Sequence, residues 1–115
     1  MSQFALTDRL YLTHILTCID NVQEDLAGGR DAMQNSRTIR DSVIRNLQVM
    51  TESSQRLSDA IKETEAAIPW KQIAGFRHRL VHDYFNIDIG LIWRVHNDHL
   101  PDLKAAAQRM LGVVG

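Results

Sequence analysis

The sequence predicts an all-α protein, an antiparallel up-and-down four-helix bundle that forms one domain over residues 1–115. Apolar side chains recur at steps of three and four residues along most of the chain, which is the period of an amphipathic helix. Aromatic residues make up only 6% of the chain, and runs of β-branched residues are scarce, so strands are not expected. Four periodic segments joined by short connections are typical of a helical bundle.

The first periodic segment has a well-marked end. Its apolar residues run from Leu6 to Leu26, and Gly28 and Gly29 follow at the place where glycines commonly end a helix. Because residues 28–36 are mainly polar and have no apolar period, we expect them to form an irregular connection.

A second helix is expected to begin within residues 36–38. There Thr38 and Asp41 have the spacing of a capping box, with Asp in place of the usual Glu. The apolar stripe that follows runs from Ile39 to Ile61 in steps of three and four. This near-heptad pattern indicates lengthwise packing against a neighbouring helix.

The last two helices are marked by prolines and by a capping residue. Pro69 stands where the first turn of a third helix tolerates proline, and the apolar line of that helix ends at Tyr84. A turn follows, and Asp88 is a suitable cap for a fourth helix over residues 89–110. Pro101 interrupts this helix, so we expect a kink or a restart there.

Composition excludes several classes of protein. With 13 basic and 14 acidic residues the formal net charge is −1, so nucleic acid would have to be held by a local cluster or by two subunits together. One cysteine, Cys18, builds neither a disulfide framework nor a zinc cage. The start of the chain is not a secretory signal, and no apolar run reaches the length of a membrane span. We expect a cytoplasmic protein without a cofactor.

The densest polar cluster covers residues 77–84, which read Arg-His-Arg-Leu-Val-His-Asp-Tyr. Arginine offers a planar fork of donors that fits a phosphate, and histidine readily gives and takes protons near neutral pH. Metal-free RNA cleavage needs these two groups. A base takes the proton of the ribose 2′-hydroxyl, and a fixed cation stabilises charge on the phosphorus intermediate.

Helix geometry restricts how these groups can cooperate. A step of five residues turns by about 140° on an ideal helix, so Arg77 and His82 would not share a face. They would converge if the helix ended or distorted near His82. They would also converge if a dimer interface brought two copies of the cluster together.

Arg77, His82 and Tyr84 match the R-x4-H-x-Y signature of HepT toxins, and the chain resembles this branch of the HEPN superfamily over residues 6–111. Many HEPN proteins carry Asn directly after the arginine, and here that position is His78. Further segments similar to the family pattern are Ile68-Pro69-Trp70, Gly75, Ile92-Trp93, Leu100-Pro101 and Val43-Ile44-Arg45-Asn46-Leu47.

The resemblance implies a function and its residues. HepT-like toxins belong to toxin–antitoxin pairs, form homodimers, and cut RNA without metal in a cleft where both Arg/His sets meet. Their antitoxin is an MNT-type nucleotidyltransferase that transfers AMP to the motif tyrosine. By this resemblance Arg77 would stabilise the phosphate, His82 would transfer protons and Tyr84 would accept AMP. We add His78 and Arg79 as RNA-binding residues.

Other interpretations of the same residues stay open. Arg77 with His82 could be a structural pair, salt-bridged to an acid on another helix. The chain could be a non-catalytic helical module that binds a nucleotidyltransferase or nucleic acid. His78 and His82 are spaced i, i+4, as in some zinc sites, and with His96 and His99 they could form a metal-binding bundle.

Overall fold

The protein is all-helical, as the sequence predicts. The computed structural model describes residues 4–115, and for Tyr84 it describes the backbone alone. Within that part of the chain there are seven α-helices, one short 3-10 helix and no strand. The α-helices are α1 (Asp8–Asp25), α2 (Asp31–Asn35), α3 (Arg37–Gln55), α4 (Asp59–Glu63), α5 (Trp70–His82), α6 (Ile89–Asp98) and α7 (Leu100–Val114), and the 3-10 helix is η1 (Tyr84–Asn86).

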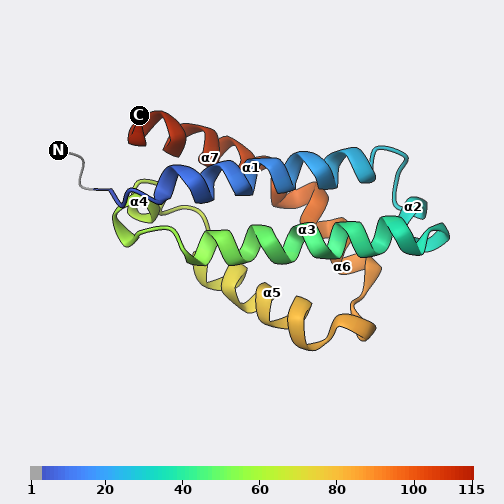
Figure 1. Ribbon diagram of the computed structural model, residues 1–115. Helices are drawn as coiled ribbons and strands as arrows, with labels where there is room; N and C mark the ends of the chain where they lie inside the picture. The colour runs from blue at the N-terminus through green and yellow to red at the C-terminus, as the bar shows by residue number, and fades with distance from the viewer. Residues whose placement is uncertain (1–3) are drawn as a thin grey trace.

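Four long helices form the bundle. The antiparallel helices α1 and α3 lie at its centre, α7 packs along α1, and α5 packs along the opposite side of α3 (Figure 1). Helix α6 crosses behind α3 and leads into α7 (Figure 1). The expected up-and-down bundle is therefore present, and α5 lies at its edge. None of the described helices combines the length and apolarity needed to cross a bilayer.

The core is the apolar stripe of each long helix, turned inward. Burying each large side chain contributes roughly 1.5–3 kcal/mol. The stripe of α1 begins later than the sequence suggests, because Leu6 is fully exposed and Leu10 is half exposed. The largest buried side chains are Leu12, Ile15, Ile19, Val22, Leu26, Met33, Leu47, Ile61, Leu80, Ile92, Leu100 and Met110.

The connection after α1, which the sequence predicts to be irregular, contains a short helix. Residues 31–35 form the short helix α2, because Met33, the one large apolar residue there, is fully buried and brings the segment into the core. Gly29 precedes it with φ +100°, a conformation that favours glycine. The cap of α3 is Ser36, whose hydroxyl accepts a hydrogen bond from the Ile39 amide, so the capping box predicted at Thr38 is wrong.

The second helix does not run to Ile61 as predicted. Helix α3 ends at Gln55, and Ser58 caps the separate helix α4 by accepting a hydrogen bond from the Ile61 amide. The carboxylate of Asp8 fixes this break. It accepts hydrogen bonds from the Ser58 amide at 2.8 Å and the Ser58 hydroxyl at 2.6 Å. Ile61 still reaches the core, so the apolar period is continuous although the helix is not.

In the second half of the chain, the helices begin at or close to the residues that the sequence predicts. Pro69 directly precedes α5 instead of lying in its first turn. Asp88 caps α6 as predicted, since its carboxylate accepts a hydrogen bond from the Gly90 amide at 2.8 Å. Pro101 lies in the first turn of α7, so the expected restart is confirmed.

We predict that Asp8→Ala lowers the free energy of unfolding by about 3 kcal/mol, because it leaves the partly buried amide and hydroxyl of Ser58 without their acceptor. Asp8 is fully buried and also accepts a hydrogen bond from the Ala5 amide. Urea titration followed by circular dichroism measures the change. Asp59→Ala is the control, because Asp59 is an exposed acid of α4. Equal stability of the two variants would contradict the role given to Asp8.

Candidate functional site

Helix α5 carries the whole Arg-His cluster and contacts the bundle along one side. Of its thirteen residues only Leu80 is buried, and its main neighbour is α3. A helix at the edge of a bundle leaves its other faces open to ligands or to another protein. Because α5 lies at the edge of the bundle, most side chains of the cluster are accessible to solvent.

Arg77 faces α3 and forms an ion pair there. Its Nε lies 2.5 Å from Oε2 of Glu52, and the side chain of Arg77 is 37% exposed. The other carboxylate oxygen of Glu52 is held by Arg56, whose Nε and Nη2 both lie 3.1 Å from Oε1. The hydrogen bond to Glu52 raises the pKa of the Arg56 guanidinium above its usual value. The alternative in which Arg77 pairs with an acid of another helix therefore describes a real contact.

A second polar contact joins α3 to the end of α5. Nε2 of Gln48 donates a hydrogen bond to the carbonyl oxygen of Leu80 at 2.9 Å. Carbonyls in the last turn of a helix have no intrahelical partner, so a side chain that donates to one stabilises the helix end. Gln48 and Glu52 are one turn apart on α3, and together they hold α5 at two points.

The two histidines of the cluster lie together on the outer part of α5. The ring centroids of His78 and His82 are 4.2 Å apart and the rings are tilted by 41°. Both His78 and His82 are exposed. The exposed ring of His82 can exchange a proton with a ligand in solvent, with the His78 imidazole beside it.

Arg77 and His82 point to different surroundings within one chain. Helix α5 continues to His82 before η1 begins, so the distortion that could have brought the two groups together does not occur before that residue. Arg77 turns to α3, whereas His82 contacts His78 on the open side. A single chain therefore supplies both side chains but does not place them close to one another. The Tyr84 side chain lies outside the described residues.

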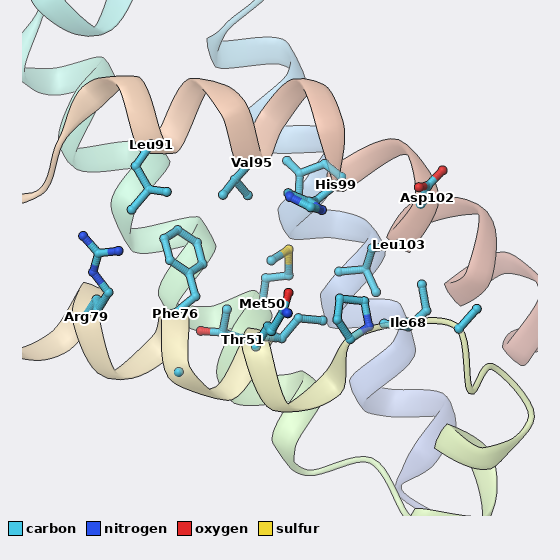
Figure 2. A pocket seen from close by; sticks show the side chains of 16 residues that line it. Met50, Thr51, Ile68, Phe76, Arg79, Leu91, Val95, His99, Asp102 and Leu103 are labelled. Atoms are coloured by element: carbon cyan, nitrogen blue, oxygen red, sulfur yellow. The ribbon is translucent and has the colours of Figure 1, made fainter.

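Arg79 lies on yet another face of α5, at an open groove. The groove has a volume of about 530 Å³ and lies between α5 on one side and α6 and α7 on the other, with Met50 and Thr51 of α3 on its floor (Figure 2). Arg79 lies at one end and Asp102 at the other (Figure 2). The walls between these ends are largely apolar, and they include Ile68, Pro69, Ile73, Phe76, Leu91, Val95 and Leu103.

The remaining histidines do not join those of α5 in a metal site. His96 stacks on Trp93 with ring centroids 5.0 Å apart, and its Nδ1 lies 3.0 Å from Oδ1 of Asn97. His99 lines the groove. Across residues 4–115, no group of three or more His, Cys, Asp or Glu side chains could hold a metal ion. The geometry that a metal-binding bundle needs is not found in that range.

Two features of the site have no signal in the sequence. Glu52 is one of 14 acidic residues, and nothing in its spacing marks it as the partner of Arg77. The groove lies between α5, which packs on α3, and α6, which packs on α7, and its width depends on the angles between these helices. The apolar periods that predict the helices do not determine those angles.

Comparison with known proteins places the chain in a family. The family described as ribonuclease HepT-like matches residues 15–110. A protein of Methanocaldococcus jannaschii named "Gamma-glutamylcyclotransferase and putative RNase" is 34% identical over 97 residues, which are 84% of this chain but only 44% of that protein. The chain thus spans less than half of this relative's length.

Two further relatives have lengths closer to this chain. A "Putative RNase" of Caldanaerobacter subterraneus subsp. tengcongensis is 28% identical over 106 residues, covering 91% of this chain and 95% of the relative. A "Probable ribonuclease HepT" of Thermococcus cleftensis is 30% identical over 69 residues, covering 60% of this chain and 63% of the relative. No solved structure matches the chain.

A helical bundle with an Arg-His cluster on an edge helix is the architecture observed here. With the family match over residues 15–110, the chain belongs to the HepT-like family of the HEPN superfamily. The resemblance identified from residues 77–84 is thereby confirmed at the level of the family.

Proposed function

We propose that the protein is a metal-independent endoribonuclease toxin of a toxin–antitoxin pair, which cleaves RNA in a cleft between two copies of the chain. The family match and the RNase names of its relatives support the reaction class. The single observation that carries the assignment to residues is the placement of Arg77 and His82 on one edge helix, both reachable from solvent.

The chemistry follows from these two side chains. His82 takes the proton of a ribose 2′-hydroxyl, and the oxygen then attacks the adjacent phosphorus. Arg77 stabilises the negative charge that builds up on the phosphate oxygens. The P–O5′ bond breaks, and a proton delivered to the leaving oxygen completes the step. His78 contacts the RNA backbone next to the reacting phosphate, whereas Arg79, which the sequence assigns to RNA binding, lies at the groove that the second copy covers.

A homodimer is part of this proposal because one chain does not bring Arg77 and His82 to the same place. The occupant that we assign to the groove beside α5 is a second copy of the chain. A two-fold axis through the middle of the groove exchanges its ends, so the Arg79 end of one copy faces the Asp102 end of the other. Opposite charges then meet at both ends, and the apolar walls between them are covered.

Tyr84 is the AMP acceptor in this proposal, and the antitoxin partner is an MNT-type nucleotidyltransferase. The backbone of Tyr84 lies in η1, two residues after His82. AMP on a phenol at this position adds negative charge and bulk where an RNA phosphate must bind, so the modification blocks cleavage by repulsion and by occlusion.

We predict that His82→Ala and Arg77→Ala each reduce RNA cleavage in the presence of EDTA by about 100-fold or more, because each removes one half of the catalytic pair. Cleavage of a labelled single-stranded RNA by purified protein measures the loss. His14→Ala is the matched control, since His14 is an exposed histidine of α1. Equal cleavage by all four proteins would refute the assigned roles. Tight RNA binding without any product would favour a non-catalytic binding module.

We predict that the wild-type protein sediments as a dimer at micromolar concentration and that Val95→Asp sediments as a monomer. Val95 is partly buried on the wall of the groove, and a carboxylate there would lose its hydration in the dimer. Val113→Asp is the control, because Val113 is 52% exposed on α7 and does not line the groove. A monomeric wild type, or a dimeric Val95→Asp variant, would show that this surface does not pair two copies.

We predict that incubation with ATP and an MNT-type nucleotidyltransferase adds AMP to Tyr84 and abolishes RNA cleavage. Mass spectrometry of tryptic peptides locates the added group. Tyr84→Phe is expected to stay unmodified and active, whereas Tyr11, the other tyrosine, should carry no AMP. AMP found on Tyr11 or on any other side chain would contradict the assignment.

A further inference from the structure

We propose that Glu52 of α3 is a positioning residue for Arg77, which it holds by Nε so that the terminal nitrogens of the guanidinium are presented to an RNA phosphate. This inference rests on the proposed ribonuclease function. Glu52 does not touch RNA in this arrangement, and it acts through Arg77 alone. Its role would therefore be separate from that of Arg77 and His82, which act on the reacting atoms.

The geometry of the ion pair carries the inference. The closest contact of the pair joins Nε of Arg77 to Oε2 of Glu52 at 2.5 Å, so the nitrogen nearest to the carboxylate is Nε and the terminal nitrogens lie further out. Among the described side chains, which leave out that of Tyr84, Glu52 is the one ion-pair partner of Arg77. A phosphate is best bound by two parallel N–H donors of one guanidinium. The terminal amino groups keep such donors available while Nε fixes the plane of the group.

Arg56 explains why a carboxylate can lie next to a phosphate-binding arginine. A lone Glu52 would cancel the charge of Arg77 and repel an approaching phosphate. Arg56 holds the other oxygen of Glu52 with two nitrogens, so the three side chains together carry one net positive charge. That charge is found in a chain whose total formal charge is −1. The cluster therefore attracts an anion locally although the protein as a whole does not.

Helix α3 also fixes the backbone of α5 near Arg77. Gln48, one turn before Glu52, donates to the carbonyl of Leu80, three residues after Arg77. The backbone of α5 and the guanidinium plane of Arg77 are thus both set from α3. Misplacing a phosphate-binding group by about 1 Å can reduce a rate by as much as 100-fold, so such support has a measurable effect.

The first experiment compares two variants that each remove one inter-helix carboxylate. Glu52→Gln keeps the shape of the side chain and removes its charge. Glu65→Gln is the matched control, because Glu65 forms a comparable ion pair with Arg109 of α7, with oxygen–nitrogen distances of 2.7 and 3.0 Å, away from the Arg-His cluster. We expect Glu52→Gln to lower kcat/KM for RNA about tenfold and Glu65→Gln to leave it unchanged. Thermal unfolding of both variants separates activity from stability.

The second experiment tests whether Glu52 acts through Arg77. In an Arg77→Lys background, which lacks the Nε donor, adding Glu52→Gln is expected to cause no further loss in single-turnover cleavage. The side-chain Nε–H signal of Arg77 in ¹⁵N NMR, assigned with Arg77→Lys, is expected to exchange slowly in the wild type and faster in Glu52→Gln. A purely structural Glu52 would lower activity equally in both backgrounds.

The possible results are distinguishable. A wild type that cleaves RNA together with a fully active Glu52→Gln variant overturns this inference and leaves the proposed function standing. An equal loss in Glu52→Gln and Glu65→Gln, or an unchanged Arg77 signal in Glu52→Gln, also overturns it. A wild type that neither binds nor cleaves RNA refutes the proposed function, and this inference falls with it.

Discussion

The contact between α3 and α5 is the constraint on which the site depends. Helix α5 has one buried residue, Leu80, so it does not have the broad apolar face by which α1 and α3 hold each other. Its position is determined by a narrow apolar contact and by the polar side chains of Gln48 and Glu52. A polar contact specifies direction as well as proximity, since hydrogen bonds weaken when their angles change. Of these two side chains, Glu52 both attaches α5 to the bundle and contacts the guanidinium of Arg77.

The period of the α-helix explains why the proposed ribonuclease would need a second copy of the chain. Five residues along a helix turn by about 140°, so a helix that extends through His82 keeps that side chain away from the face of Arg77. Bending α5 to bring the two together would break backbone hydrogen bonds in its last turn. Pairing two chains needs no such distortion, because symmetry can bring a different face of a second helix to the same place. The groove beside α5 is an open apolar surface on which such pairing can occur.

The sequence predicts the parts of this fold that depend on local chemistry. Asp88 marks the start of α6 and Pro101 marks the start of α7, because capping and the missing proline amide act within one turn. The sequence does not predict the break after Gln55, since the apolar period continues through it and the cause is the carboxylate of Asp8, fifty residues away in the chain. Contacts of this kind depend on tertiary structure, which a period along one helix does not contain.

In the candidate site, too, the sequence predicts the local motif but not the side chains that pack against it from another helix. Residues 77–84 can be found from their composition, because two arginines and two histidines in so short a stretch are unusual in a chain of net charge −1. Their surroundings cannot be found in that way. Glu52 becomes part of the site only through the packing of α3 on α5, and its effect on the local charge depends in turn on Arg56 one turn further along α3. A phosphate near Arg77 would respond to all three charges, since at such short range neither water nor salt screens them fully. The electrostatics of the site are therefore a property of the helix pair and cannot be assigned to the motif alone.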